Sequence, residues 1–301
     1  MLAVTGANGQ LGQRLLCALA PRQPVRALVR SSRARDAVAR LALGSRVETR
    51  VVDYRAGDDL AAALAGCAAV VHLPGIIRES RNNRFTDAHE RACRALADGA
   101  ARAGVRRVVY TSIHGANPES LNACLASKGA AERLLHEGAV PASVLRLPMV
   151  LGEGDFAARA LAARARRRVN LVLRGASLEQ PIYAGDVVTA VRAVLDLTSP
   201  APLYELAGPE SLPRAALIRR AAGVLGRRTR VVSVPLVAGL AAAWALERLS
   251  DQPPVTRAML GVLDHDDHID PAPAAAALGM TLTPLDATLA RCLRGPAAPV
   301  D

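Results

Sequence analysis

The sequence predicts an α/β fold, a doubly wound parallel sheet with a smaller C-terminal α+β lobe. In the first half, short apolar segments alternate with helical patterns at the spacing of βαβ units. A glycine-rich turn separates the first apolar segment from the first helix. The regular alternation of predicted strands and helices changes after Gly152. The chain has 301 residues, of which 51% are hydrophobic and 2% aromatic, so Ala, Leu and Val must fill its core.

The first half contains six candidate strands joined by helices. The expected strands are Leu2–Val4, Pro24–Arg30, Val47–Val52, Ala68–Leu73, Arg107–Thr111 and Ala142–Leu147. The expected helices are Gln10–Leu19, one capped by Asp58 and running through Leu64, Phe85–Ala103 ended by Gly104, and Ser127–Glu137.

The change of pattern near Gly152 predicts two domains, residues 1–152 and residues 153–301. The second is expected to hold the helices Phe156–Arg168, Asp186–Leu197, Pro213–Leu225, Leu236–Leu249, Val255–Leu263 and Pro284–Leu293. Its extended segments are Val169–Leu173, Leu203–Leu206 and Thr229–Val234, and we expect the strand near 203–206 to return to the main sheet. In such folds this lobe covers the carboxyl edge of the sheet, where ligands bind.

The first turn has the pattern G-x-x-G-x-x-G at Gly6, Gly9 and Gly12. The first glycine allows a tight turn, the second lets a pyrophosphate approach the backbone, and the third lets the helix pack closely on the strand. The N-terminus of the following helix is an anion site. We therefore expect residues 1–152 to be a Rossmann domain that binds a dinucleotide through Gly6, Ala7, Asn8, Gly9, Gln10, Leu11 and Gly12.

The end of the second strand predicts which dinucleotide is bound. An acidic residue there binds the 2′-hydroxyl of NAD, whereas arginine suits the 2′-phosphate of NADP. The chain has Arg30 at this place and no carboxylate until Asp36. This favours NADP(H) over NAD(H). The alternative is that Arg33 and Arg35 are surface residues of the next helix and do not bind the cofactor.

Lys128 is the only lysine in the chain, and every other Lys or Arg position is arginine. A coding bias towards arginine explains the others, but arginine cannot replace lysine where a compact point charge is required. We therefore interpret Lys128 as a binding residue for ribose hydroxyls rather than as a surface charge.

Several further segments resemble the extended and atypical short-chain dehydrogenases/reductases over nearly the whole chain. They include Val109–Ser112, Ser127–Glu132, Arg146–Gly152, Tyr183–Val187 and Tyr204–Pro209. The chain is most similar to the group around the nucleotide-binding accessory subunit of complex I and to NmrA-like proteins, many of which bind NADP(H). The resemblance implies that the cofactor also contacts Asp53, Tyr54, Leu73, Pro74, Gly75, Thr111, Lys128, Pro148, Met149 and Val150. It implies a substrate near Ser112, Ile113 and His114.

The chain departs from the family at the proton relay. The catalytic tyrosine of the family stands four residues before its lysine, which is Cys124 here, and the family's hydroxyl residue falls at about Ile113. The relay asparagine aligns loosely with His89. We keep Lys128 and Cys124 as the candidate catalytic residues, although a buried cysteine more often only packs. The interpretation is an NADP(H)-binding protein without the Tyr/Ser relay, with a cofactor-binding, sensor or assembly role. The alternative is an NADPH-dependent reductase of an apolar small molecule such as a quinone or enone.

Composition narrows the remaining classes of function. The net charge of +11 comes from arginines that are spread over most helices and are densest from Arg159 to Arg168. Few aromatic residues are present that could stack on bases, so nucleic acid is not expected as a partner.

The five cysteines show no C-x-x-C pattern, and with the first strand starting at Leu2 they predict a reduced, cytoplasmic protein without a signal peptide. No metal site is expected, because the acidic and histidine run 264–268 is typical of a solvated loop. Residues 235–249, with Trp244, could contact a membrane surface or a protein partner, the alternative being core packing.

Overall fold

A computed structural model describes residues 1–80, 83–249, 260–261 and 266–294. The chain forms two compact units, one of Met1–Arg146 with Val188–Tyr204 and one of Leu147–Val187 with Glu205–Asp301. The predicted α/β class with a parallel doubly wound sheet is confirmed. Among the described residues, no helix is both long and apolar enough to cross a membrane.

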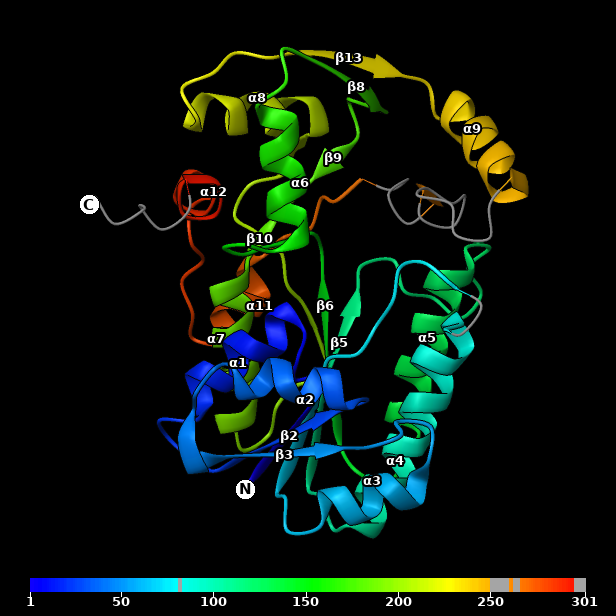
Figure 1. Ribbon diagram of the computed structural model, residues 1–301, viewed down its shortest axis with the longest axis vertical. Coiled ribbons are helices and arrows are strands. Elements are labelled where there is room, and N and C mark those ends of the chain that lie inside the picture. The colour runs from blue at the N-terminus through cyan, green and yellow to red at the C-terminus, as the bar shows by residue number, and fades with distance from the viewer. Residues whose placement is uncertain (81–82, 250–259, 262–265, 295–301) are drawn as a thin grey trace. The chain divides into compact units, whose positions relative to one another are not determined.

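The first unit is built on a seven-stranded sheet with the order β11-β6-β5-β4-β1-β2-β3 (Figure 1). The strands are β1 (Leu2–Thr5), β2 (Val25–Val29), β3 (Val47–Val51), β4 (Ala69–His72), β5 (Arg107–Ile113), β6 (Ala142–Leu147) and β11 (Leu203–Glu205). Strand β1 pairs in parallel with both β2 and β4, which places the ends of these three strands side by side. The order reverses direction at β1, and this is where open α/β sheets bind their ligands.

Helix α4 (Ala92–Arg102) packs against both α3 (Gly57–Leu64) and α5 (Ala123–His136), and the three helices bury an apolar cluster that includes Val70 and Val108 of the sheet. Helix α1 (Gln10–Leu19) packs on β1 and β2, and α2 (Ser32–Ala39) packs on β2 and β3. The hydrophobic pattern predicted α1 and the strands correctly because the apolar residues that form the pattern are the buried ones. Leu15 and Leu16 of α1 are examples.

Two local predictions were wrong. Asp58 does not cap α3, because Ala56 is the N-cap and the Asp58 carboxylate accepts a hydrogen bond from Arg102 Nη1 at 2.7 Å. Helix α5 begins at Ala123, four residues before the predicted start, because the Asn122 side chain accepts from the backbone N–H of Cys124 at 2.9 Å. The helix predicted at Phe85–Ala103 is present, and it opens with the π-helical segment η2 (Thr86–Arg91) before α4 begins.

The second unit packs α6 (Phe156–Ala165), α8 (Arg214–Val224) and α12 (Leu285–Arg294) around an apolar cluster that includes Leu161, Leu217 and Leu289. Three small two-stranded sheets join β7 (Val150–Leu151) to β10 (Ile182–Tyr183), β9 (Leu178–Glu179) to β12 (Leu212–Pro213), and β8 (Val169–Leu173) to β13 (Arg230–Val234). Helix α9 (Leu236–Leu249) follows β13, α11 spans Ala272–Ala277, and α7 (Ala184–Asp196) continues into the first unit. The helix predicted at Val255–Leu263 lies outside the described residues except at 260–261.

Buried polar side chains fix the loops of this second unit. Arg214 Nε donates to the Glu179 carboxylate at 2.6 Å, and both side chains are largely buried. The Asp186 carboxylate accepts hydrogen bonds from the backbone N–H and the hydroxyl of Thr283 at 2.8 and 2.7 Å. A buried charge is tolerated when it is paired or hydrogen-bonded, so these residues have a structural role.

Candidate dinucleotide site

The turn after β1 is packed so tightly that its glycines are required. Gly6 has φ +67°, a left-handed conformation that favours glycine. A Cβ atom on Gly12 would lie 2.5 Å from the carbonyl oxygen of Gly6, and one on Gly9 would lie 3.2 Å from the same atom. Helix α1 starts at Gln10 with no side-chain cap and no acidic residue in its first turn. Its N-terminal N–H groups therefore remain suited to an anion.

Tyr54 holds this turn in place from the end of β3. Its hydroxyl accepts a hydrogen bond from the Gly6 N–H at 2.8 Å and donates to the Leu28 carbonyl at 2.5 Å. Burial raises the pKa of the phenol to about 12, so the hydroxyl keeps the proton that it donates. Tyr54 thus connects the carboxyl ends of β1, β2 and β3.

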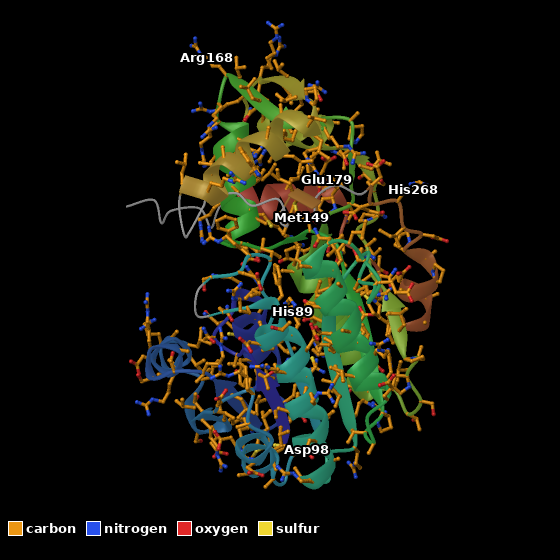
Figure 2. All side chains as sticks on the ribbon, turned by 90° about the vertical axis from the view of Figure 1, so that its right-hand side faces the viewer. His89, Asp98, Met149, Arg168, Glu179 and His268 are labelled. Atoms are coloured by element: carbon orange, nitrogen blue, oxygen red, sulfur yellow. The ribbon has the colours of Figure 1, made fainter. Side chains whose placement is uncertain are left out.

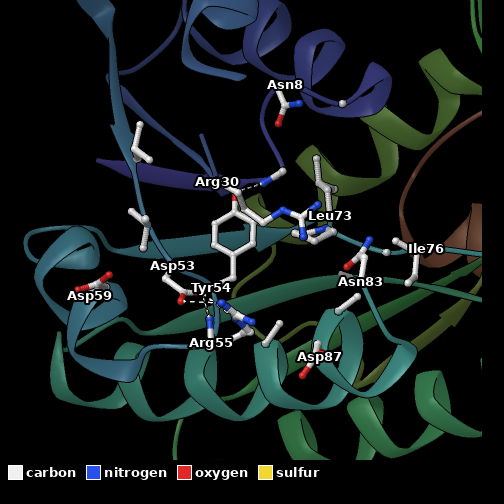
Figure 3. Close-up of a pocket in the computed structure, with 18 residues that line it drawn as sticks. Asn8, Arg30, Asp53, Tyr54, Arg55, Asp59, Leu73, Ile76, Asn83 and Asp87 are labelled. Atoms are coloured by element: carbon white, nitrogen blue, oxygen red, sulfur yellow. Dashed lines mark hydrogen bonds and ion pairs between the residues drawn. The ribbon is translucent and has the colours of Figure 1, made fainter. Parts of the chain in front are cut away.

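A cavity of about 640 Å³ opens at the carboxyl ends of these strands (Figure 3). Nine of the residues predicted to bind the cofactor line it: Gly6, Asn8, Gly9, Arg30, Asp53, Tyr54, Leu73, Pro74 and Gly75. Six others lie in the same unit without lining the cavity: Ala7, Gln10, Leu11, Gly12, Thr111 and Lys128. Pro148, Met149 and Val150 belong to the second unit. For all of the residues named in this paragraph, contact with the cofactor stays a prediction.

The cavity also has charged lining residues that sequence reasoning missed. Arg55 makes two hydrogen bonds of 3.1 Å to the Asp53 carboxylate. Those bonds, together with the charges of Arg55 and Arg30, lower the pKa of Asp53. Asp59 and Asp87 line the same cavity (Figure 3). Only the Asp53–x–Arg55 spacing directly after the third strand could have identified Arg55.

Arg30 enters the cavity from the end of β2, and Figure 3 shows its side chain beside Tyr54. Arg33 and Arg35, by contrast, are exposed residues of α2, and Arg35 faces the Asp36 carboxylate at 3.9 Å. Of these three arginines, only Arg30 lines the cavity.

Lys128 is buried, which excludes the interpretation as a free surface charge. Its Nζ donates to the Tyr110 hydroxyl at 3.0 Å and to the Thr111 carbonyl at 3.1 Å, which uses two of its three donors. Burial lowers its pKa to about 8. A Cβ atom on Gly75 would lie 3.0 Å from Nζ, so the absence of a side chain on this cavity-lining glycine leaves room beside the ammonium.

His89, which aligns loosely with the family's relay asparagine, is a buried neutral residue of η2. Its Nε2 accepts a hydrogen bond from the Ile76 N–H at 3.1 Å, so Nδ1 carries the proton and donates to Ser127 Oγ at 2.7 Å. Burial and the nearby charge of Lys128 lower its pKa to about 3. His89 therefore fixes the position of Ile76, which follows Gly75 in the loop after β4 and lines the cavity with it.

Cys124 is also buried, and its Sγ lies 3.6 Å from the Ile76 carbonyl oxygen. Burial raises the pKa of the thiol to about 11, although the charge of Lys128 opposes this effect. The thiol is therefore a weak acid that does not form a reactive thiolate at neutral pH, and this favours packing. A catalytic role for Cys124 stays a prediction.

The three residues predicted to meet a substrate lie at the end of β5. Ser112 and His114 are buried and Ile113 is half-buried. Within the described part of the chain, Ser112 Oγ and His72 Nε2 have no hydrogen-bond partner. A buried polar atom without a partner is costly, so these two atoms at the ends of β5 and β4 are suited to a bound ligand or water.

The acidic and histidine run 264–268 shows no metal geometry in its described part. Asp266 accepts a hydrogen bond from Ser177 Oγ at 2.8 Å, which fixes the loop before β9. Asp264 and His265 lie outside the described residues. Among the residues that the structure describes, no cluster of three His, Cys, Asp or Glu side chains is arranged to hold a metal ion.

The switch point of a parallel sheet, the glycine turn and the cavity beside them are together typical of a dinucleotide-binding protein. A family model described as NAD(P)H-binding matches residues 6–175. The chain belongs to this NAD(P)H-binding family, within the atypical short-chain dehydrogenases/reductases. The resemblance stated from the sequence is thus confirmed.

Known proteins similar to the chain include two reductases and a subunit of a mitochondrial NADH dehydrogenase. A ceramide reductase of Caulobacter vibrioides is 30% identical over 81% of this chain and 78% of that protein. Subunit 9 of the mitochondrial NADH dehydrogenase (ubiquinone) 1 alpha subcomplex of Arabidopsis thaliana is 30% identical over 69% of this chain and 53% of that protein. The structure of a Citrobacter triphenylmethane reductase complexed with NADP(H) has a TM-score of 0.75, with 21% identity over 96% of this chain and 99% of that chain.

Proposed function

We propose that the protein binds NADP(H) without using the Tyr/Ser proton relay, and that it acts as a cofactor-dependent sensor or assembly protein. The cavity at the switch point, lined by Gly6 and Gly9 of the glycine turn and by Arg30, carries this proposal. The tight Gly6–Gly12 packing and the uncapped start of α1 fit a pyrophosphate. Room beside the Lys128 ammonium at Gly75 fits a ribose hydroxyl.

The preference for NADP(H) over NAD(H) rests on Arg30. The backbone around Gly6 and Gly9 would hold the pyrophosphate, and Arg30 would hold the 2′-phosphate by a charge-assisted hydrogen bond. Arg30→Asp should weaken NADP(H) binding by about 1.5–3 kcal/mol, the range for a hydrogen bond to a charged group. Calorimetric titration measures this loss. Arg33→Asp, the same change on the exposed face of α2, is the matched control and should bind NADP(H) nearly as the unchanged protein does. A loss of equal size in both variants would contradict the role of Arg30.

The absence of the relay is supported by the two positions that should carry it. Cys124 is a buried thiol with a raised pKa, and Ile113 offers no hydroxyl to orient a substrate carbonyl. Cys124 thus has a weakly acidic thiol in place of the family's phenol, and Ile113 has no hydroxyl, which favours a role without the relay. A cofactor-binding role needs neither of them.

The second candidate is an NADPH-dependent reductase of an apolar small molecule. The ceramide reductase that is 30% identical over 81% of the chain favours it, as does the retained Lys128. In such an enzyme the bound cofactor supplies a hydride, while Lys128 holds a ribose and Ser112 and His114 lie near the substrate.

Oxidation of NADPH in the presence of a panel of quinones, enones and aldehydes separates the two candidates. Absorbance of NADPH is followed with the unchanged protein and with Lys128→Ala. No oxidation across the panel, together with measurable NADP(H) binding, supports the binding role. Turnover that falls at least about tenfold in Lys128→Ala, a loss of about 1.4 kcal/mol of transition-state stabilisation, supports the reductase and contradicts our primary proposal.

A further inference from the structure

The second unit exposes an apolar strand face. Strands β8 and β13 pair in parallel, with Leu171 opposite Val232 and Val169 opposite Arg230. Side chains alternate between the two faces of a strand, so these four residues share one face. Leu171 is 71% exposed, Val169 54% and Val232 37%. Three aliphatic side chains therefore lie in contact with solvent on one small surface.

This surface is bordered by arginines. Arg166, Arg167 and Arg168 immediately precede β8 and are all exposed, and Arg228 and Arg230 flank the start of β13. In Figure 2, Arg168 lies at an outer end of this unit among other nitrogen-tipped side chains that point away from the ribbon. We refer to Val169, Leu171 and Val232 together with these arginines as the basic-apolar face.

The charge of the face has one sign. Residues 156–178 and residues 211–246 contain six arginines each and neither Asp nor Glu. Some of these arginines reach carboxylates elsewhere, as Arg214 reaches Glu179 and Arg220 reaches Glu210 and Asp286. Among the described residues, no carboxylate forms an ion pair with Arg166, Arg167 or Arg168. The face thus carries positive charge that the rest of the described chain does not neutralise.

Helix α9 continues the apolar character of the face. A Cβ atom on Gly239 would lie 2.6 Å from the Leu173 side chain, so α9 packs on the end of β8. Its residues Val237 and Trp244 are 76% and 46% exposed, and Arg248 lies 4.2 Å from the centroid of the Trp244 ring. A tryptophan beside an arginine is typical of segments that lie at a membrane–water interface.

We propose that the basic-apolar face and α9 dock the protein on a membrane surface that contains anionic lipids. The arginines match the lipid phosphates, and the aliphatic side chains with Trp244 match the boundary of the acyl chains. A second copy of this chain fits worse, because a two-fold contact would bring arginines against arginines. A nucleic acid fits worse because the strand face offers aliphatic rather than aromatic side chains to the bases.

The full-length protein tests this proposal with vesicles of phosphatidylcholine alone and vesicles with about 30 mol% phosphatidylglycerol, measured by flotation and fluorescence. Trp244 is the only tryptophan in the chain, so its emission reports directly on this surface. We expect binding to the anionic vesicles only, with a shift of the emission to shorter wavelength. Binding should weaken as salt screens the charges.

Two variants and a control make the test specific. Replacing Arg166, Arg167 and Arg168 by Gln should weaken vesicle binding by about two orders of magnitude, since each basic residue near an anionic surface contributes about 1 kcal/mol. Leu171→Asp should abolish the emission shift. The control replaces the exposed Arg40, Arg94 and Arg106 of the first unit by Gln, with the same change in net charge, and should bind as the unchanged protein does.

Three results would overturn the proposal: equal binding to both kinds of vesicle, an equal loss in the triple variant and its control, or a Trp244 emission that vesicles leave unchanged. Binding to a single-stranded RNA oligomer without binding to vesicles would assign the face to nucleic acid instead. Cofactor titration of each variant is independent of these outcomes, so failure here would leave the proposed NADP(H) site unaffected.

Discussion

Cys124 stands four residues before Lys128 on α5, where the related dehydrogenases carry a tyrosine. A thiol becomes reactive as the thiolate, and burial that raises its pKa to about 11 keeps it protonated at neutral pH. We expect iodoacetamide to label the exposed Cys17 and to leave Cys124 nearly unlabelled near neutral pH, as read by mass spectrometry of the folded protein. Fast labelling of Cys124 that NADPH prevents, with a coupled loss of turnover, would show that it is a catalytic thiol.

Lys128 is the residue whose burial should be visible in the pH dependence of stability. Its pKa is lowered from 10.5 to about 8, so between these values the unfolded chain holds a proton that the folded chain has released. The free energy of unfolding should therefore rise with pH across this window, by up to about 3 kcal/mol, and lose this gain as the pH falls towards 8. Urea unfolding of the cofactor-free protein, compared with Lys128→Met, isolates the contribution because the variant keeps all other titrating groups. The same pH dependence in both proteins would show that Lys128 is not desolvated.

At the scale of the element, the turn between β1 and α1 depends on the close approach of Gly12 to Gly6. A Cβ on Gly12 would lie 2.5 Å from a backbone oxygen, which cannot move away as a flexible side chain can. Gly12→Ala should lower the free energy of unfolding by about 1–3 kcal/mol, the usual cost of overpacking, and weaken NADP(H) binding in calorimetry.

Gly223→Ala is the matched control for this prediction. Gly223 lies in α8, where an added Cβ meets no atom within 4 Å. Alanine should therefore stabilise the protein by about 0.5–1 kcal/mol through its higher helix propensity. A Gly12→Ala protein as stable as Gly223→Ala would mean that the turn is looser than the structure indicates.

At the scale of the whole molecule, the sequence predicted the main sheet well because periodicity and burial coincide there. Strands such as β2 and β4 are short apolar runs, and α1 has its leucines on one buried face. The two-residue strands β7, β9, β10 and β12 escaped notice because two residues carry no periodicity. The early start of α5 depends on the Asn122 cap, which no hydrophobic pattern encodes. The same holds for the contact between His89 of η2 and Ser127.

Some residues of the candidate site were likewise predicted from the sequence, and others were missed. Gly6, Gly9 and Arg30, predicted from motifs, and the segment Leu73–Gly75, predicted from the family resemblance, all line the cavity. Arg55 was missed because its significance arises from its pairing with Asp53, and the tyrosine hydroxyl that contacts Lys128 comes from Tyr110 in another element. Local motifs predict the positions where the backbone can approach a cofactor. Contacts between side chains of separate elements can be recognised only once the fold is known.

Calorimetric titration of the purified protein with NADP(H) and with NAD(H), under the same buffer and salt, tests the central claim most directly. If Arg30 holds the 2′-phosphate, NADP(H) should bind more tightly than NAD(H) by about 1.5–3 kcal/mol. Equal affinity for the two cofactors, or tighter binding of NAD(H), would contradict the assignment.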